Sequence, residues 1–443
     1  MNLNELKDVL REMGVVGAGG AGFPSYAKLS DKAETIILNC AECEPLLKVH
    51  RQVLEEFTFE ILSAMNEIVK VTGAKQGIVA IKSHYKSTLK ALENEIEAFP
   101  ALSISTLDSV YPAGDEIILI KEVTGKVVDP GKLPISVGVV VCNVESVYNA
   151  YRAINGKPVM TKYVTVAGEV AKPLTVCAPI GTKISELINA AGGVTCDDPA
   201  FISGGPMMGK LIDIKEVVTK TTNAIIVLPS NHTVILNKNR NAAINLRRAM
   251  SVCCQCKTCT ELCSRNVLGY PVEPHAVMKV LSNGGKGDGR VILDALFCSG
   301  CGLCETYSCP QDLSPRAIIA EIKATARKNG IKPPEDVKPN LNVRHADMKK
   351  VSVERLTGRL GLRKYDVPAP LTDPIHTNSV KIMLTQHLGA PGVACVSEGD
   401  VVERGSVIAK AAENALSVNI HASIAGKVTA VTPKYIKITR QVQ

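Results

Sequence analysis

The sequence predicts a multidomain protein that combines α/β and α+β folds. Its 443 residues exceed what one hydrophobic core usually organises, so two to four domains of roughly 100–200 residues each are expected. The apolar pattern changes along the chain from helices alternating with strands, to a strand-rich stretch, to helices, and back to strands. Nine of the fifteen cysteines gather between residues 253 and 309, which indicates a metal or redox centre in the helical part.

The first expected domain covers residues 1–158 and has an α/β pattern. Helical stretches alternate there with short β-rich runs such as "ETIILNC", "QGIVAIK" and "VGVVVCNV". The loop "GAGGAG" at residues 17–22 spells GxGxxG, but a helix precedes it and a strand follows it, unlike the dinucleotide-binding fingerprint. These glycines therefore indicate either a flexible turn or a loop whose backbone N–H groups approach a phosphate or a flavin.

The remaining domains follow from changes in composition. Residues 159–235 predict a small mixed unit, rich in strands, with one helix at "TKISELINAAGG". Residues 240–330 are helical around the cysteines, and residues 331–378 are rich in Pro, Lys and Arg, as expected of a basic linker. Residues 379–443 return to short strands and turns, which predicts a compact all-β module.

Two cysteine runs in the helical segment repeat one pattern. They read C-x2-C-x2-C-x3-C and C-x2-C-x2-C-x4-C-P. Structural zinc usually uses two CxxC pairs separated by a long insert, and it remains the alternative. Three closely spaced cysteines instead wrap three corners of an iron–sulfur cubane, and the fourth thiolate comes from the other run. The sequence thus predicts two [4Fe–4S] clusters, one on Cys253, Cys256, Cys259 and Cys309 and the other on Cys298, Cys301, Cys304 and Cys263. Cys254 falls outside this spacing.

Charge and hydropathy limit which cellular location and which partners are expected. No apolar run reaches the roughly 18 residues of a membrane span, and the first residues lack the parts of a signal peptide, so a cytoplasmic chain without a transmembrane segment is expected. Residues 316–365 hold thirteen Lys and Arg against five Asp and Glu, which would attract an acidic partner or form a solvated face. No aromatic-interleaved basic motif accompanies this charge, so nucleic acid is not an expected partner.

Four motifs in the first domain carry a family resemblance. In order, "GAGGAGFPSYAK", "LNCAECEPLLK", "YPAGDE" and "CNVES" resemble the flavin-binding motifs of the flavin subunit of respiratory complex I and of the C subunit of the Rnf electron-transport complex. The stretch with "ISGGPMMGK" is similar to the soluble-ligand-binding β-grasp domain of those families, and "IHASIAGKVTAV" resembles the barrel-sandwich module of the Rnf C subunit. The whole chain, with that module last, resembles the cobalamin reductases of propanediol-utilisation microcompartments.

The resemblance implies a Rossmann-like domain that binds FMN and NADH, followed by β-grasp, two-cluster ferredoxin-like and barrel-sandwich domains. Leu46 stands where complex I has a glycine, and Cys142 where it has one of a pair of asparagines. Without the ordered motifs, the four carboxylates among the implied site residues would be interpreted as solvated loop groups. The residues that it assigns to the FMN pocket are Gly17, Gly19, Gly20, Gly22, Lys28, Asn39, Glu42, Glu44, Tyr111, Gly114, Asp115, Glu116 and Asn143.

The combination predicts an NADH-dependent oxidoreductase with no catalytic nucleophile or general base. NADH delivers two electrons as a hydride and a cubane accepts one, so a flavin must stand between them. The resemblance implies cob(III)alamin or cob(II)alamin as the acceptor, a place in the cytoplasm or inside a bacterial microcompartment, and contact with a shell protein or a corrinoid-processing enzyme. The alternatives are a soluble Rnf-like donor that feeds another electron-acceptor protein and a non-enzymatic electron-transfer adaptor.

Overall fold

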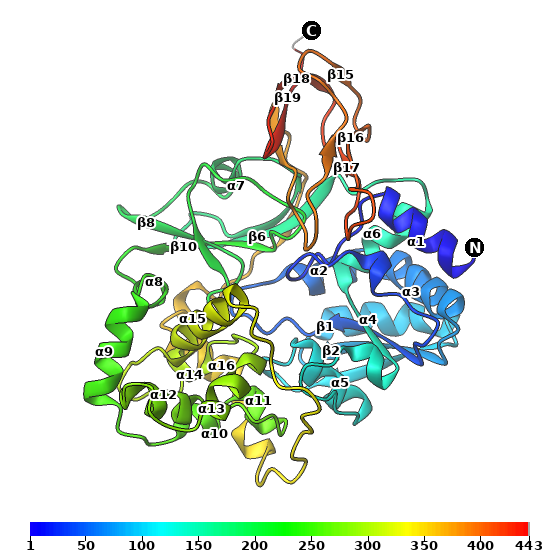
Figure 1. The fold of residues 1–443 in the computed structure, drawn as a ribbon. Helices are drawn as coiled ribbons and strands as arrows, with labels where there is room; N and C mark the ends of the chain where they lie inside the picture. The colour runs from blue at the N-terminus through cyan, green and yellow to red at the C-terminus, as the bar shows by residue number, and fades with distance from the viewer. Residues whose placement is uncertain (442–443) are drawn as a thin grey trace.

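The computed structural model describes residues 1–441, and its N-terminal part is a domain of parallel strands and helices. Its elements are α1 (Leu3–Glu12), η1 (Ser25–Ala27), β1 (Thr35–Cys40), α2 (Val49–Glu56), α3 (Thr58–Thr72), β2 (Gln76–Lys82), α4 (Lys86–Glu95), η2 (Ile96–Ala98), β3 (Leu102–Leu107), β4 (Val110–Tyr111), α5 (Glu116–Thr124), η3 (Pro134–Val137), β5 (Val139–Asn143) and α6 (Val144–Ile154). The sheet order is β3-β2-β1-β5, all parallel. Figure 1 shows β1 and β2 among the helices of this domain. Helices cover both faces, which explains the unbroken apolar run of β1. Ile36 and Leu38 share a core with α3 and α6, whereas Ile37 shares one with α5.

A six-stranded mixed sheet follows this domain in the chain. Its own segment supplies β6 (Thr161–Gly168), β7 (Leu174–Pro179), α7 (Ile184–Ala190), β8 (Pro199–Ser203), β9 (Lys210–Ile212), β10 (Ala224–Pro229) and α8 (Thr233–Lys238). The order is β12-β7-β6-β10-β8-β9, where β12 (Leu371–Thr372) comes from much later in the chain. The strand β6 pairs in parallel with β10 and antiparallel with β7. Leu187 of α7 packs against Val164 and Val166, so this helix covers one face of the sheet.

Short helices surround the two cysteine runs. They are α9 (Ala242–Val252), α10 (Thr258–Glu261), α11 (Ser264–Val267), α12 (Pro274–Ser282), α13 (Gly289–Asp294), η4 (Ala295–Phe297), α14 (Leu303–Thr306) and α15 (Pro315–Lys328). Small apolar clusters join them, such as the one that contains Ala249 of α9, Met278 of α12 and Ile318 of α15. In Figure 1 this helical domain lies beside the N-terminal domain and below the mixed sheet.

Residues 331–378, expected as a basic linker, form short elements that pack against two domains. They contain η5 (Asp347–Lys349), β11 (Val351–Ser352), α16 (Val353–Arg359), η6 (Arg363–Tyr365) and β12. The strand β11 pairs with β4 of the N-terminal domain, and β12 extends the mixed sheet through β7. Leu356 and Leu362 lie in a core with Ile226 of β10. This segment therefore ties the domains to each other.

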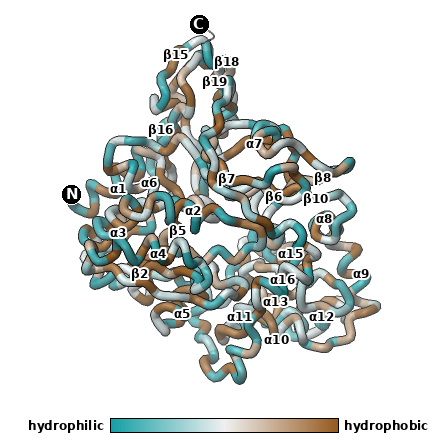
Figure 2. The backbone as a smooth tube through the Cα atoms, turned by 180° about the vertical axis from the view of Figure 1, so that it is seen from behind, coloured by the Kyte–Doolittle hydropathy of each residue, from teal (hydrophilic) through white to brown (hydrophobic). Residues whose placement is uncertain are grey.

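Two small sheets form the C-terminal module. Its strands are β13 (Ser379–Met383), β14 (Val393–Ala394), β15 (Val401–Val402), β16 (Val407–Lys410), β17 (Ile420–His421), β18 (Gly426–Val431) and β19 (Tyr435–Thr439). The sheet orders are β13-β19-β18-β15 and β14-β16-β17. Ile408 and Ile436 share one apolar core with Leu6 and Leu10 of α1, which fixes the module against the N-terminal domain. In the described part of the chain, no helix combines the length and the apolar character needed to cross a bilayer, and Figure 2 shows polar and apolar residues interspersed along the helices.

Candidate functional site

A cavity of about 440 Å³ lies in the N-terminal domain between the glycine loop, the strand β5 and the helix α6. Its floor is apolar where Val139, Val140 and Val141 of β5 face it. Ser146 and Val147 from the first turns of α6 close one side. The residues predicted for the FMN pocket that line this cavity are Gly17, Gly19, Gly20, Gly22, Lys28, Asn39, Glu116 and Asn143.

The glycine loop is held at both ends. The Gly17 N–H donates to the Phe23 carbonyl at 2.8 Å, and the Ala18 N–H donates to the Ser146 hydroxyl at 2.8 Å. Gly22 has a φ of 74°, a left-handed conformation that favours glycine. A Cβ on Gly20 would meet no protein atom within 4 Å, and Gly20 lines the cavity. The loop therefore presents its backbone to an open space that a ligand can fill.

Asn143 connects the cavity to a buried histidine. Its Oδ1 accepts hydrogen bonds from the N–H groups of Glu145 at 3.0 Å and Ser146 at 3.3 Å and so caps α6. Its Nδ2 lies 3.0 Å from Nε2 of His50. Burial lowers the pKa of His50, which favours the neutral ring that can accept this hydrogen bond. A side chain on Gly19 would clash with the Asn143 amide, so this glycine keeps the amide in place.

One cation lies at the cavity wall. Lys28 Nζ is 3.0 Å from Oε1 of Glu116 and donates to the Val141 carbonyl at 3.3 Å. About a third of each of the two side chains is exposed (33% and 37%), so a bound anion can reach the ammonium group. A phosphate at this position would find a lysine and the backbone N–H groups of the glycine loop on neighbouring sides.

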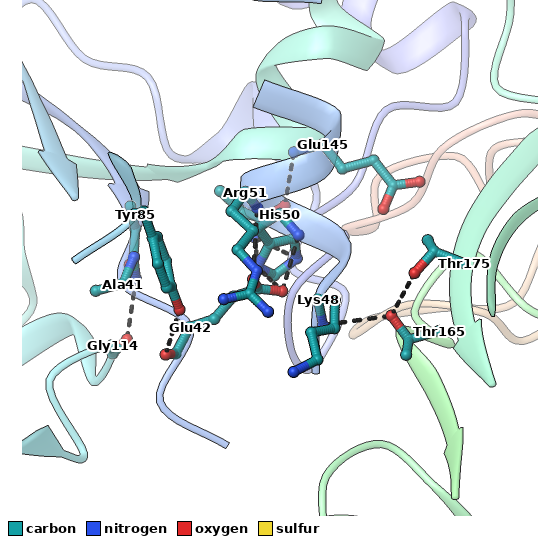
Figure 3. A network of polar contacts seen from close by, with 12 residues as sticks. Ala41, Glu42, Lys48, His50, Arg51, Tyr85, Gly114, Glu145, Thr165 and Thr175 are labelled. Atoms are coloured by element: carbon teal, nitrogen blue, oxygen red, sulfur yellow. Dashed lines mark hydrogen bonds and ion pairs between the residues drawn. The ribbon is translucent and has the colours of Figure 1, made fainter. Parts of the chain in front are cut away.

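The other five predicted pocket residues lie outside the cavity lining; they are Glu42, Glu44, Tyr111, Gly114 and Asp115. The Glu42 carboxylate accepts from the N–H groups of His50 at 2.8 Å and Arg51 at 3.4 Å, as Figure 3 shows, and so caps α2. The Tyr85 hydroxyl donates to the Glu42 carbonyl at 3.3 Å. Glu42 thus supports His50 and, through it, Asn143.

Glu44 joins the N-terminal domain to the mixed sheet. Its two carboxylate oxygens accept from the N–H groups of Met207 at 2.8 Å and Met208 at 2.7 Å, in the "GGPMMG" loop. Burial raises the pKa of Glu44, and these two N–H groups, followed by Lys238 and Arg316, oppose the rise. This carboxylate is therefore a contact between domains, in contrast to the solvated loop group that an isolated motif would suggest.

Three residues of the "YPAGDE" loop connect the cavity to the helical domain. The Tyr111 hydroxyl donates to the Cys301 carbonyl at 2.6 Å. The Gly114 carbonyl accepts from Nδ2 of Asn39 at 2.9 Å. Asp115 caps α5 through the Ile117 N–H at 3.1 Å and binds both terminal nitrogens of Arg265 at 2.7 and 2.9 Å. Neither Arg265 nor His50 belongs to a sequence motif, and only the folded chain reveals their contacts with predicted site residues.

The cysteines of the two runs lie near one another: Cys253, Cys256, Cys259 and Cys309 line one small cavity, and Cys263 shares an apolar cluster with Cys298. We call Cys253, Cys256, Cys259 and Cys309 the outer set and Cys263, Cys298, Cys301 and Cys304 the inner set. Burial, followed by the nearby Cys309, Cys256 and Cys253 thiols, raises the pKa of Cys259 to about 12. Burial raises the pKa of Cys263 to about 12, and the nearby Cys301 and Cys298 contribute to the rise. The fourth cysteine of each run thus lies near cysteines of the other run. That the two sets bind clusters stays a prediction. Within residues 1–441, no three His, Cys, Asp or Glu side chains converge as ligands of one metal ion.

The two cysteine loops share one backbone conformation. Gln255 and Lys257 have φ values of 53° and 65°, and the equivalent Gly300 and Gly302 have 75° and 86°. These left-handed positions turn the chain between successive cysteines, so that thiols at a spacing of three residues can face one centre. The Gly300 N–H lies 3.3 Å from the Cys298 sulfur, and the Leu313 N–H lies 3.4 Å from the Cys309 sulfur. Such N–H···S contacts suit thiolate ligands of an iron–sulfur cluster.

Four family models match the chain in the order of the predicted domains. They are the Nuo51 FMN-binding domain at residues 10–152, the SLBB domain at 163–211, the 4Fe-4S dicluster domain at 252–314 and the RnfC barrel sandwich hybrid domain at 365–443. These matches confirm the predicted fold class and the resemblance to the complex I and Rnf proteins.

Two curated relatives match almost the whole chain. Cobalamin reductase PduS of Citrobacter freundii is 39% identical over 438 residues, which cover 98% of this chain and 96% of the relative. The protein of the same name from Salmonella typhimurium is 39% identical over 443 residues, covering 99% and 97%. The C subunit of the ion-translocating oxidoreductase complex of Vibrio cholerae is 31% identical over 278 residues, 61% of this chain and 34% of that protein. The fold is shared with a solved structure, an NAD⁺-reducing [NiFe]-hydrogenase in the H₂-reduced state. The match has a TM-score of 0.50 and 18% sequence identity, and it covers 81% of this chain and 67% of the hydrogenase chain.

Proposed function

Because this chain belongs to the family of the cobalamin reductases PduS and is a flavin and iron–sulfur oxidoreductase, we propose that it oxidises NADH and reduces a corrinoid, cob(III)alamin or cob(II)alamin. One FMN and two [4Fe–4S] clusters, held by the cavity and by the two cysteine sets, would supply the redox chemistry. The observation that carries this proposal is the single loop, residues 110–116, that contacts both the cavity of the N-terminal domain and the cysteines of the inner set.

The cavity has the size and the chemistry for FMN. Its volume of about 440 Å³ falls within the range of small-molecule sites, roughly 300–1,000 Å³. Backbone N–H groups at Gly19 and Gly20 and the Lys28 ammonium would bind the phosphate, and the apolar residues of β5 would pack against the ring system. FMN accepts two electrons as a hydride and releases them singly, which is the chemistry that links NADH to one-electron carriers.

The protein's own residues bind and orient these groups. Asn143 offers an amide at the cavity, which Glu42 and His50 support from behind. Glu116 holds the Lys28 ammonium at 3.0 Å before an anion arrives. The predicted ligands of the clusters are the four thiolates of the outer set and the four of the inner set. A hydride transfer followed by single-electron steps needs no nucleophile, in keeping with the absence of a catalytic residue from the prediction.

The acceptor follows from the names of the relatives, and the location follows from the sequence resemblance. The name cobalamin reductase favours a corrinoid acceptor. The resemblance to microcompartment reductases adds to the proposal a shell protein or a corrinoid-processing enzyme as the partner and the cytoplasm or a microcompartment as the location. The match to the Vibrio cholerae ion-translocating complex favours a second candidate, a donor that feeds another electron-acceptor protein. The excess of Lys and Arg at residues 316–365 would suit an acidic protein in either case.

Anaerobic reconstitution of the full chain tests the proposal. We expect about eight iron and eight sulfide per chain with one FMN, and bleaching of the visible absorption by NADH. Hydroxocobalamin added to the NADH-reduced protein should then be reduced, with NADH consumed in proportion. Stoichiometric zinc without iron would refute the cluster assignment. Reduction of a ferredoxin but not of hydroxocobalamin would favour the Rnf-like donor.

A further inference from the structure

The inner and outer cysteine sets differ in burial. Cys263, Cys301 and Cys304 of the inner set are 8%, 8% and 7% exposed. Cys256 of the outer set is exposed, and the three other members of that set are half-buried. The adjacent Lys257 is also exposed. A cluster on the outer set would therefore lie near the protein surface, and one on the inner set would lie inside the protein.

The inner set also contacts the N-terminal domain. Cys263 and Cys298 pack with Ile117 and Ile118 of α5 in one apolar cluster. The Cys301 carbonyl accepts the Tyr111 hydrogen bond of 2.6 Å. In contrast, the apolar cluster that contains Cys253 and Cys309 is formed by Ala249, Met278, Leu313 and Ile318 of the helical domain, together with the half-buried Leu281 and Ile322.

Two short connections lead from the inner set to the cavity. In the first, Tyr111 lies three residues before Gly114, whose carbonyl binds the cavity residue Asn39 at 2.9 Å. In the second, Arg265 lies two residues after Cys263 and binds Asp115, which directly precedes the cavity residue Glu116. Both connections pass through buried or half-buried side chains, so their geometry is fixed by packing.

We propose that the cluster on the inner set accepts each electron from the flavin, that the cluster on the outer set passes it to the acceptor at the surface, and that Tyr111 and Arg265 are positioning residues for the inner cluster. This order rests on the proposed function. One NADH gives one NAD⁺, one proton and two electrons. The two electrons leave the protein one at a time, either to two one-electron acceptor molecules or in two successive transfers to the same acceptor. Since electron transfer slows steeply with distance, contact with the cavity domain selects the inner set as the first acceptor.

Two variants with one cluster each test the order in the reconstituted full chain. Cys256→Ala removes a ligand of the outer set, and Cys304→Ala removes one of the inner set. Iron analysis should give about four iron per chain in each, and flavin analysis should show FMN in both. We expect NADH still to reduce the remaining inner cluster of Cys256→Ala. In Cys304→Ala, dithionite should reduce the remaining outer cluster, whereas NADH should not. Should Cys304→Ala fail to fold, the exchange Cys298→Ala and the result for Cys256→Ala still decide the order.

Three conservative variants test the positioning role. Tyr111→Phe removes the hydrogen bond to Cys301 and keeps the ring, and we expect a shifted EPR spectrum for the reduced inner cluster and an unchanged one for the outer cluster. Tyr270→Phe is the matched control, because the buried Tyr270 hydroxyl also donates across these domains, to the Val128 carbonyl at 2.6 Å. Its two EPR signals should equal those of the wild type. Arg265→Lys should keep the charge but lose the paired contact with Asp115, and it should shift the same signal as Tyr111→Phe.

The outcomes separate this proposal from the function on which it rests. If NADH reduces neither cluster of the wild-type protein while dithionite reduces both, the proposed function fails. A different result would reverse the order. In it, NADH reduces both wild-type clusters and the lone outer cluster of Cys304→Ala, but does not reduce the lone inner cluster of Cys256→Ala. Equal EPR spectra for Tyr111→Phe and Tyr270→Phe would remove Tyr111 from the positioning role.

Discussion

The Tyr111 hydroxyl donates a hydrogen bond of 2.6 Å to the carbonyl of Cys301, which lies 190 residues further along the chain. Tyr111 is 3% exposed, so this bond forms inside the protein, where an unpaired hydroxyl would be costly. It joins the second cysteine loop to the loop that supports Asn39 at the cavity. The cavity and the inner cysteine set are therefore parts of one packed arrangement.

Gly20→Val should abolish FMN binding without unfolding the protein. A Cβ at Gly20 meets no protein atom within 4 Å, whereas Gly20 lines the cavity, so a larger side chain should occupy ligand space only. We expect flavin analysis of the reconstituted variant to show about eight iron and no FMN. Gly289→Val is the control, because Gly289 also has no atom within 4 Å of its Cβ and lies in α13. Full FMN content in Gly20→Val would mean that the loop is a turn and binds no flavin.

Breaking the Asp115–Arg265 pair should lower the free energy of unfolding substantially. The side chains are 16% and 10% exposed, and removal of one partner from such a buried pair typically costs about 3–5 kcal/mol. We expect this loss in Arg265→Met, measured by denaturant unfolding, and a partial recovery in the double variant with Asp115→Asn. Lys338→Met, at the exposed pair with Asp129, should leave the unfolding midpoint unchanged. A similar small effect in Arg265→Met would contradict a structural role for this pair.

Lys220 should make stability rise with pH. Its Nζ donates to the Gly14 carbonyl at 2.7 Å and the Asn419 carbonyl at 3.1 Å, and burial lowers its pKa to about 7. The unfolded chain keeps this proton up to about pH 10.4, so it binds more protons than the folded chain between these pKa values. Burial, followed by Lys220, lowers the pKa of the neighbouring His421 to about 4, so that ring stays neutral in this window.

The comparison of wild type with Lys220→Met measures this effect. From about pH 7.5 to 9 the free energy of unfolding of the wild type should rise relative to the variant by up to about 1.4 kcal/mol per pH unit. The variant keeps the length of the side chain and loses the ionisable group, so other titrations cancel in the difference. Parallel pH profiles for the two proteins would contradict a buried Lys220 with a lowered pKa.

Exchange of the left-handed residues in the two cysteine loops should change the free energy of unfolding in opposite directions. Lys257 has a φ of 65°, a conformation that costs a residue with a side chain roughly 1–2 kcal/mol relative to glycine. We therefore expect Lys257→Gly to raise the free energy of unfolding. Gly302→Ala should lower it, because Gly302 has a φ of 86° that a side chain strains, while the added Cβ would meet its nearest atom at an ordinary 3.5 Å. Chemical unfolding of the apoprotein measures both. Changes of the same sign would contradict the equivalence of the loops.

Sequence patterns predicted the parts of the site that depend on local spacing. The C-x2-C-x2-C runs predicted that the fourth cysteine comes from the other run, and in the structure Cys259 and Cys309 line the same small cavity. The glycine loop lines the cavity, as the motif order implied. The resemblance assigned Glu44 and Asp115 to the FMN pocket, but the patterns could not show their contacts with other domains. Their partners, the Met207 and Met208 N–H groups and Arg265, lie more than 140 residues away. His50 was equally hidden, since only the folded chain brings it to Asn143.

The most direct test compares two reductants in Gly20→Val and the wild type, each reconstituted with iron, sulfide and FMN. NADH and dithionite should both bleach the clusters of the wild type. In flavin-free Gly20→Val, dithionite should still bleach them because it donates single electrons, whereas NADH should not, and reduction of hydroxocobalamin should follow the same pattern. If NADH bleaches the clusters of the flavin-free variant at the wild-type rate, the path from NADH through a flavin in this cavity to the cysteine-bound clusters is wrong.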